Sequence, residues 1–456
     1  MTNLMLHLRE NNVFVFVIVY LSFLLDNVLL TVVVPIIPDY LFSNVLNVTV
    51  IEESNRLGPA SLSPLQRKYE TLENENGPLG ALLASKAFVQ LAFTPLIGYL
   101  TGVVGCNIPL LIGSCNMLLA AILFAYGNSY RLLVLARALH GSSSAAIAVS
   151  GMCILAKNLP KELRVKLMPL SFGGIALGVL IGYPLGGAAY QLFGKPAPFL
   201  FIGFFVSLNI VLQVLYLKDD QVEEGSSTIK GNYTEWVRLL KDKQTLLATF
   251  VICICTSSMA VLEPCVPMWL LAHLNPPPSR WQLGAIFIPD SIGYFVGSHF
   301  TGLLPVLPWR ISLSAMVLTG LSCCALPLVN SISQLALPHF GVGLGVGAVD
   351  AALVPLLANF VDRKGSTQYG PVYALQQASV AVAYSFGPLL GGQAVHVFGF
   401  PWLMRIVGFL NLLICPLLLE LDNGEEKKML LLNQSTSYST LDSTSMDEQE
   451  GDNFSS

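Results

Sequence analysis

Long apolar runs alternate with short polar connections along almost the whole chain. A membrane-spanning helix needs about 20 mostly apolar residues. On that template, helices are predicted at residues 13–37, 78–100, 108–127, 131–155, 167–190, 197–217, 246–272, 283–305, 309–330, 335–358, 370–393 and 398–420. The pattern therefore predicts an all-α integral membrane protein with twelve transmembrane helices.

Longer polar segments divide these helices into two sets of six. An acidic segment at about 38–77 lies inside the N-terminal six-helix half, residues 1–217. A basic central loop at 218–245 precedes the C-terminal six-helix half at 246–420. The Ser-rich acidic tail at 421–456 has a composition typical of disorder. Transporters with this two-half layout place the substrate site between the halves, near the middle of the membrane.

Lysine and arginine are distributed unevenly between the connections, which predicts the orientation. Cytoplasmic loops carry an excess of these residues, and here they concentrate at 156–166, at 359–369 and in the central loop. Both termini and the central loop are therefore expected in the cytoplasm, and the 38–77 loop in the lumen or outside. The Asn47 sequon lies in that loop, so Asn47 is the predicted glycosylation site.

Charged residues are scarce, at 11% of the chain compared with about 25% in a typical soluble domain. The net charge of −4 and the lack of a basic stripe argue against a nucleic-acid partner. Nearly all nine cysteines lie in apolar stretches, and none has a His partner at zinc spacing. The pairs Cys253–Cys255 and Cys323–Cys324 are interpreted as small apolar core residues. No metal or other cofactor is expected, and no nucleophile–base constellation indicates an enzyme.

Six ionisable residues nevertheless stand inside the predicted helices, where an unpaired charge is costly and usually functional. The four acids and two bases have a net charge of −2 if all are ionised: Asp26, Glu263, Asp290, Asp350, Lys86 and Arg137. An acidic midplane suits an organic cation and protons that compete for the same carboxylates. Such competition is a physical basis for exchanging protons for an amine, because a bound proton removes the charge that holds the amine.

The four acids have different expected roles. Asp26, deep in the first helix, is favoured for substrate contact over structural pairing with a cation. Glu263 precedes a proline, so its carboxylate lies beside a helix break, which favours a functional role. Asp350, in a Gly-rich helix, is the preferred proton carrier. For Asp290, proton coupling and simple exposure to water both stay open.

The basic and aromatic residues support this site. Lys86 is expected to pair with an acid, as a structural or a gating element. Arg137 lies near the start or middle of the fourth predicted helix, where a functional role is favoured over snorkelling to the interface. His140 shares a helix face with Arg137; a packing role is favoured and a proton relay is the alternative. Aromatic faces that could surround a cationic amine belong to Trp269, Tyr294 and Tyr384.

Glycines are clustered at residues 173–187 in the fifth predicted helix and at 387–392 in the eleventh. Small residues let membrane helices approach closely and weaken helical hydrogen bonding locally. Plain helix packing and bending linked to function are both consistent with these clusters.

Several stretches together are specific to one family: LDNVLLTVVVPIIP (25–38), LASKA (83–87), LEP (262–264), WQLG (281–284), FGVG (340–343), VD (349–350) and FPWLM (400–404). Over most of the twelve helices the chain resembles the vesicular amine transporters of the major facilitator superfamily, and the vesicular monoamine transporters more than the acetylcholine branch. The resemblance implies the major facilitator architecture. It also implies a proton antiporter that loads monoamines into acidic synaptic or secretory vesicles by alternating access.

The resemblance further implies a role for each matched residue. Lys86 would belong to an ion-pair network, Arg137 to gating and Asp350 to proton coupling. The amine site would be formed by Asp26, Asn27, Glu263, Trp269, Tyr294 and Tyr384.

The chain also departs from the family pattern. The family has an Asp in helix eleven that pairs with the helix-two Lys, but this position is Gln377 here, so Lys86 loses its expected partner. Either Asp290 takes over, or the proton stoichiometry differs. A family His just after helix ten corresponds to Gly365, and the luminal loops lack the family's Cys pair. The chain is therefore a divergent member whose substrate need not be a monoamine.

The tail carries a sequence similar to the family's acidic dileucine sorting signal, formed by Glu426, Leu430 and Leu431. It supports a vesicular membrane and trafficking adaptors as partners. The predicted function is thus proton-coupled antiport of an organic amine across a vesicle membrane. The alternatives are transport of another organic cation, such as a polyamine or an acetylcholine-like amine, and a non-transporting receptor or scaffold that kept the fold.

Overall fold

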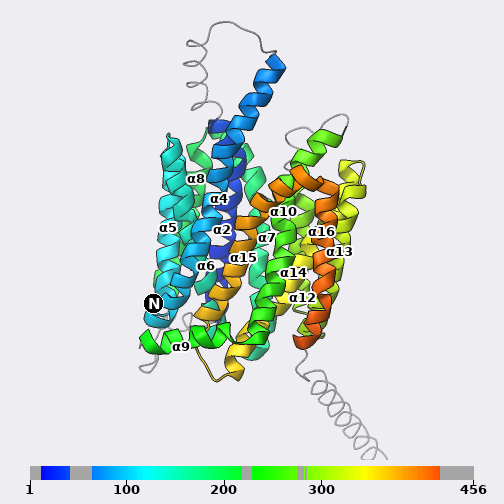
Figure 1. Cartoon of the computed structure of the whole chain (residues 1–456). Coiled ribbons are helices and arrows are strands. Elements are labelled where there is room, and N and C mark those ends of the chain that lie inside the picture. Colours follow the sequence, from blue (N-terminus) through cyan, green and yellow to red (C-terminus); the bar gives the residue numbers. More distant parts are fainter. Residues whose placement is uncertain (1–11, 42–63, 218–228, 275–281, 283–284, 422–456) are drawn as a thin grey trace, which may run out of the picture.

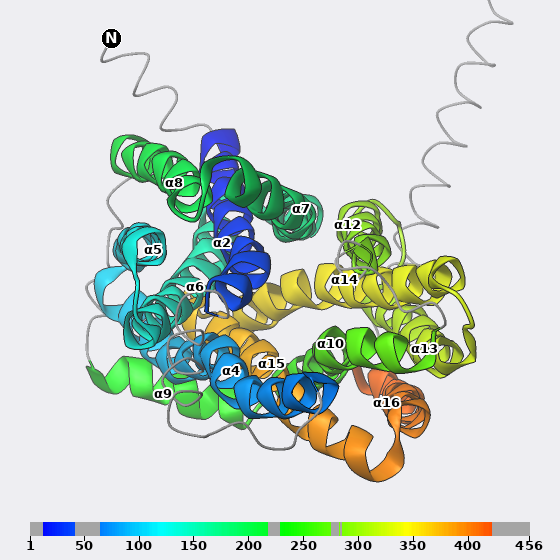
Figure 2. The same cartoon turned by 90° about the horizontal axis from the view of Figure 1, so that it is seen from above.

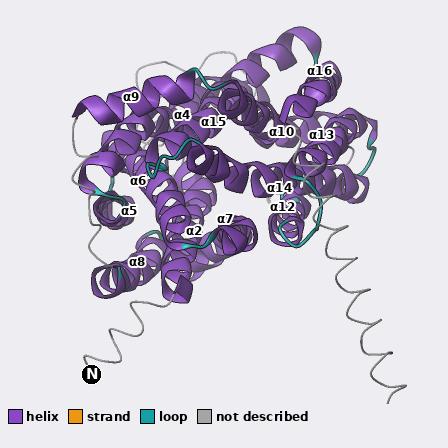
Figure 3. Cartoon of the chain, turned by 90° about the horizontal axis from the view of Figure 1, so that it is seen from below, coloured by secondary structure: helices purple, strands orange, loops and turns teal. Residues whose placement is uncertain are grey.

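The computed structural model describes residues 12–41, 64–217, 229–274, 282 and 285–421, and over these residues it is a helical bundle without strands (Figure 1, Figure 3). Helices lie at all twelve predicted positions. The first half contains α2 (Asn12–Leu41), α4 (Pro64–Val104), α5 (Asn107–Tyr126), α6 (Tyr130–Asn158), α7 (Lys161–Phe193) and α8 (Pro196–Tyr216). The second contains α10 (Lys243–His273), α12 (Ile288–Thr301), α13 (Pro308–Ala325), α14 (Ile332–Arg363), α15 (Gly370–Phe398) and α16 (Phe400–Ile414). Two short 3-10 helices, η2 (Leu326–Leu328) and η3 (Cys415–Leu421), extend α13 and α16.

Ten of the helices in the described part of the chain are long and apolar enough to cross a membrane. The other two bundle helices are α12, with 14 helical residues, and α15, where polar residues such as Gln376 and Gln377 lower the hydropathy. Both are packed inside the bundle, α12 against α14 and α15 against α4 and α10. The fold is that of a multi-pass membrane protein.

The two halves are visible as separate groups of helices when the bundle is viewed along its axis (Figure 2). They meet where α4 lies against α15 and where α7 lies against α12 and α14. Residues on these helices that point toward the other half are therefore the ones that can form a site between the halves.

Two elements extend beyond the sequence-based prediction. α4 begins at Pro64, inside the segment 38–77 that was expected to be a loop. A helix of 41 residues is about 60 Å long, roughly twice the hydrocarbon thickness, so its polar first turns lie beyond the lipid. The central segment contains α9 (Ile229–Leu240), which lies across one end of the bundle (Figure 1). This end is called the α9 end below.

α9 is fixed to both halves of the bundle. The ring of Trp236 packs over Gly98 of α4, where an added Cβ would lie 2.9 Å from it. Arg238 Nη2 donates a hydrogen bond to the carbonyl oxygen of Lys364, just after α14, at 3.1 Å. The segment joining the halves is thus an ordered helix at this point rather than the plain loop that was expected.

The residue that follows α9 and starts α10 is also held by the second half. Asp242 accepts a hydrogen bond from the Thr245 amide at 3.1 Å, and its Oδ2 lies 2.6 Å from Lys364 Nζ. Burial raises the pKa of Asp242, but the hydrogen bonds from Lys364 and Thr245 more than offset this, so the pKa falls below its ordinary value. The carboxylate is therefore charged at neutral pH and stabilises the start of α10.

Glycines of α7 form the contact surface for α2. They recur every four residues, so they share one face of the helix: Gly174, Gly178, Gly182 and Gly186. At Gly178, an added Cβ would lie 2.5 Å from the carbonyl oxygen of Leu24 and 2.9 Å from Cβ of Asn27. This close packing sets the position of α2, which carries Asp26, and is the plain packing role considered for the cluster.

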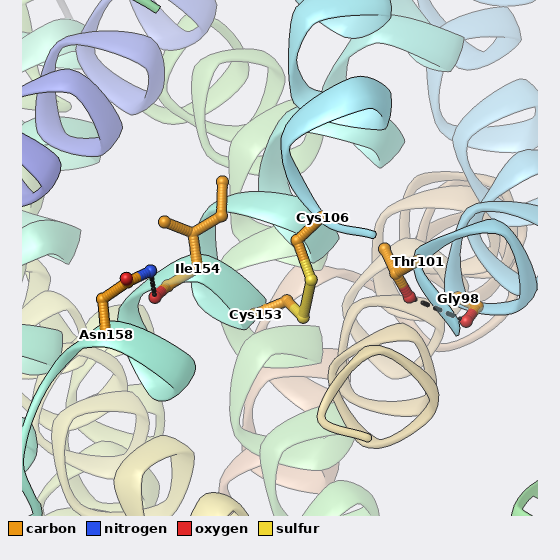
Figure 4. The surroundings of a disulfide bond; sticks show 6 residues. All are labelled: Gly98, Thr101, Cys106, Cys153, Ile154 and Asn158. Carbon is orange, nitrogen blue, oxygen red and sulfur yellow. Dashed lines mark hydrogen bonds between the residues drawn. A yellow bond between two sulfur atoms is a disulfide. The ribbon is translucent and has the colours of Figure 1, made fainter. Parts of the chain in front are cut away.

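One pair of cysteines forms a bond that the sequence analysis did not predict. Cys106 and Cys153 form a disulfide bond with a Cα–Cα distance of 6.2 Å (Figure 4). It links the turn between α4 and α5 to the last part of α6, because that turn places Cys106 against α6. Seven other cysteines are free, and Cys255 and Cys323 among them are buried as expected.

We expect Gly178→Ala to destabilise the protein, because the new methyl group would overlap the backbone of α2. Overpacking of this kind costs about 1–3 kcal/mol. Gly187→Ala is the matched control, since nothing lies within 4 Å of a Cβ at this position of the same helix. Thermal denaturation of the purified variants in detergent measures the difference, and equal melting temperatures would contradict the proposed α2–α7 contact.

Candidate functional site

The carboxylate of Asp26 on α2 is the most completely hydrogen-bonded acid in the middle of the bundle. Its side chain is buried, and Oδ1 lies 3.1 Å from His140 Nε2. The Ser144 hydroxyl donates to both carboxylate oxygens, at 2.8 and 2.9 Å. Hydrogen bonds to a charged group contribute about 1.5–3 kcal/mol each. The two donors lie one turn apart on α6, so this helix fixes the position of the carboxylate.

Two cations lie close to this carboxylate. Lys86 on α4 is half-buried and interacts electrostatically with Asp26, Glu263 and Arg137. Arg137 on α6 is only 4% exposed, so it does not snorkel to the interface. It interacts with Glu263, Tyr183 and Asp26, and its Nε and Nη1 have no hydrogen-bond partner among the described residues. Both cations therefore belong to one charge network with the two acids.

Glu263 connects this network to the second half of the bundle. It lies on α10, but the cations that act on it, Arg137 and Lys86, belong to the first half. A carboxylate that faces those cations does not face lipid, yet Glu263 is exposed. We infer that water reaches the space between the halves at this point.

The second half contributes a further acid with a tyrosine partner. Asp350 on α14 is buried, and its Oδ2 accepts a hydrogen bond from the Tyr294 hydroxyl of α12 at 2.8 Å. Its Oδ1 has no hydrogen-bond partner among the described residues. Tyr384 on α15 interacts electrostatically with Asp350, Glu263 and Asp290. Asp350 and Glu263 thus share Tyr384 as a neighbour, and that they form one site stays a prediction.

Asp290 is buried near the start of α12 at 8% exposure, so the alternative that it merely faces water is wrong. The charges that act on Lys86 come from Asp26, Glu263 and Arg137, whereas Asp290 interacts with Glu263. Among the described residues, Asp290 therefore does not replace the carboxylate that Lys86 was expected to lose. Gln377 is buried on α15 and brings no charge to the site.

Two residues predicted to contact the amine interact with side-chain or backbone groups other than the charged residues described above. Asn27 Nδ2 donates to the carbonyl oxygen of Phe23 on its own helix at 2.8 Å. The indole ring of Trp269 stacks on Phe400 of α16, with 4.7 Å between the ring centroids. Their role in binding stays a prediction. Asn47, Glu426, Leu430 and Leu431 lie outside the described residues.

The α9 end of the bundle carries a second polar cluster, which holds the two halves together. Arg164 Nη1 of α7 donates to Asp362 Oδ2 of α14 at 2.7 Å, and its Nη2 donates to the Tyr369 hydroxyl at 3.1 Å. Tyr369, just before α15, in turn donates to Asp362. Burial and this hydrogen bond raise the pKa of Tyr369, so it stays a neutral phenol. Arg164 is buried, and the bridge closes the halves against each other at this end.

Sequence reasoning did not find all of these residues. Ser144 and Tyr183 lie in runs of small residues, where a hydroxyl gives no separate signal. Arg164 and Asp362 stand in the basic connections that were used only to predict orientation. No group of three or more His, Cys, Asp or Glu among the described residues is placed to bind a metal ion.

A two-half helical bundle with charges buried between the halves, and a closure between the halves at one end, defines a secondary transporter of the alternating-access class. The family model of the Major Facilitator Superfamily matches residues 15–304 and 245–435. The chain is 35% identical to the human synaptic vesicular amine transporter, over 93% of this chain and 91% of that protein. It is 34% identical to the rat chromaffin granule amine transporter, with the same coverage. It therefore belongs to the Major Facilitator Superfamily, in the family of the vesicular amine transporters.

Other comparisons agree with this placement. The vesicular acetylcholine transporter of Torpedo marmorata is 34% identical, over 91% of this chain and 82% of that protein. Among solved structures, the human organic anion transporter MFSD10 (TETRAN) matches with a TM-score of 0.71 at 18% identity, over 90% of this chain and 99% of that one. The proton:xylose symporter XylE matches with a TM-score of 0.67 at 14% identity, over 90% and 95%. At these identities the structural matches show the fold alone.

Arg164→Ala is expected to weaken the closure at the α9 end, because it leaves Asp362 buried without its cation. Breaking a buried pair in this way costs about 3–5 kcal/mol. Lys161→Ala is the matched control: its ammonium is 3.8 Å from the same carboxylate, but the side chain is 69% exposed.

The measurement is the yield of a cross-link between the halves. A Cβ added at Gly302, which follows α12, would lie 3.5 Å from Cβ of Pro169 on α7, a distance that suits a disulfide. Pro169→Cys and Gly302→Cys are therefore introduced together, and their disulfide is quantified by mass spectrometry. The yield should fall in the Arg164 variant and stay unchanged in the Lys161 variant. An equal yield in both would show that the bridge does not hold this end closed.

Proposed function

We propose that this chain is a proton-coupled antiporter that loads an organic amine, of the monoamine type, into acidic vesicles by alternating access. The observation that carries the proposal is the charge network shared by the halves: Asp26 on α2 and Glu263 on α10 interact with the same two cations, Lys86 and Arg137. A cationic amine that enters between them meets acids from both halves, and its binding is thereby sensitive to their relative position.

The open side of the site follows from the two polar clusters. The Arg164–Asp362 bridge ties the halves together at the α9 end, while Glu263 stays exposed to water. Water therefore enters from the opposite end. The α9 end carries the basic segments, which favour the cytoplasm, so the structure corresponds to a state open to the lumen. The termini are then cytoplasmic, and Asn47 is on the luminal side.

Proton exchange at such a site is competition for carboxylates. A luminal proton binds Asp350, whose Oδ1 has no hydrogen-bond partner among the described residues, and the amine leaves its ion pairs with Asp26 and Glu263. Each protonation makes the site less negative and weakens its hold on a cation. Opening of the α9 end then lets the proton leave and the next amine bind.

The relatives support an amine as the substrate, since two of them are named amine transporters and a third is an acetylcholine transporter. The last observation favours a second candidate, an organic cation of the acetylcholine type; a polyamine is another. A vesicular membrane and trafficking adaptors at the tail belong to the same proposal. A receptor or scaffold that kept the fold would give no flux at all.

Uptake into liposomes that contain the purified protein tests the proposal. Monoamines, polyamines and acetylcholine are compared under an imposed pH gradient with an acidic interior. Uptake of one class that requires the gradient supports antiport and identifies the substrate. Equal uptake without the gradient contradicts antiport, and an absence of flux for every class supports the scaffold.

Asp26→Asn should lower the rate of gradient-driven uptake about 100-fold, because the loss of a buried ionic contact costs about 3 kcal/mol. Asp350→Asn should abolish gradient-driven uptake, because an asparagine cannot take up the proton. Glu420→Gln is the control, because Glu420 pairs with Lys243 at the surface and is 46% exposed. Initial uptake rates in the same liposomes, at matched protein content, measure the effect. Wild-type rates in the Asp26 variant would remove this residue from the amine site.

A further inference from the structure

His140 forms a hydrogen bond with the carboxylate of Asp26, and a packing role alone does not explain this contact. His140 is fully buried in the middle of α6. Its Nε2 faces two oxygen atoms of the same residue, the Asp26 carboxylate at 3.1 Å and the Asp26 backbone carbonyl at 3.3 Å. Both are acceptors, so Nε2 must carry a hydrogen. The packing interpretation favoured from the sequence predicts no such contact with a membrane-buried acid.

The other ring nitrogen has the opposite character. Nδ1 of His140 is buried and has no hydrogen-bond partner among the described residues. In a neutral imidazole whose Nε2 carries the hydrogen, Nδ1 is the bare nitrogen with a free lone pair. It can therefore take up a proton without breaking any bond that the ring makes to Asp26.

The charged groups around His140 make this proton responsive to the amine. Burial of the ring opposes a proton on Nδ1, as do the positive charges of Lys86 on α4 and Arg137 on α6, while Asp26 of α2 attracts it. Glu263 of α10 acts on both cations, and Gln377 on α15 is buried and uncharged. An ammonium group bound at Asp26 would add a third positive charge and displace the proton from the ring.

We propose that His140 is a proton-coupling residue of the transport cycle, so that one exchanged proton is carried by Nδ1 of this ring. This inference rests on the proposed antiport. A luminal proton binds Nδ1 and gives an imidazolium, Nε2–H stays on the Asp26 carboxylate, and the pair changes from a net charge of −1 to 0. The amine then leaves to the lumen. On the cytoplasmic side the proton leaves Nδ1 as the next amine binds.

The assignment also supplies a titratable group in place of the acid that the family resemblance implies at position 377. Gln377 carries no proton, and the carboxylates that act on Lys86 are those of Asp26 and Glu263. A histidine paired with Asp26 adds a titratable group to this charge network.

The test replaces His140 with glutamine, whose amide can still donate to Asp26 but cannot take up a proton. At equilibrium, the amine gradient rises about tenfold per pH unit for each proton exchanged. The slope of the logarithm of amine accumulation against the pH difference should therefore be lower by one in His140→Gln, which corresponds to one proton fewer. The amine affinity at neutral pH should stay within a few fold of the wild-type value. His339→Gln, a buried histidine on α14 bonded to the Ile286 carbonyl oxygen, should leave the slope unchanged. Ser144→Ala should weaken amine binding without changing the slope.

An unchanged slope in His140→Gln overturns the inference while the proposed antiport stands; no gradient-driven uptake by the wild type overturns the antiport itself. Should His140→Gln and His140→Asn both fail to fold, Asp350→Asn decides, because protons that this variant releases on binding amine do not come from Asp350. Amine binding to Asp350→Asn in weakly buffered detergent should still release protons, measured with a pH-sensitive dye. Binding without proton release at any pH at which the protein stays folded contradicts the role of His140.

Discussion

The arrangement depends on the cost of placing charges where water is scarce. Asp26, Glu263, Lys86 and Arg137 form one charge network in the bundle, where an unpaired charge is costly. The structure resolves the problem by sharing: Lys86 and Arg137 each interact with an acid from either half. Because the partners belong to different halves, any movement of one half against the other changes how well the charges are satisfied. Electrostatics and the relative position of the halves are therefore coupled.

Hydropathy and the cost of intramembrane charge predicted most of the fold and much of the site. All twelve helix positions and the burial of Asp26, Asp290, Asp350 and Arg137 agree with the prediction, because both depend on the solvent that each segment meets. The polar start of α4 and the central helix α9 were not found, since neither needs to be apolar. The α4–α5 turn likewise gave no signal for the Cys106–Cys153 bond.

The sequence did not predict which side chains meet between helices. The choice of His140 as the partner of Asp26 depends on how α2 and α6 are registered, and the glycine face of α7 fixes that register only once the helices are packed. Arg164 was used only to predict orientation, and Asp362 was not singled out, although the two side chains meet across the interface. A charge near a helix end carries the same local pattern in both situations, so a three-dimensional arrangement is needed to separate them.

The position of α9 has a mechanical consequence. Trp236 rests on α4 of the first half, while Arg238 is bonded to the turn after α14 of the second. Because α9 is attached to both halves, it restricts their separation at this end. When the halves part at this end, one attachment must release, and the connector will travel with whichever half keeps it. Releasing an attachment of α9 therefore adds a free-energy cost to every transport cycle, and this cost does not depend on the solute.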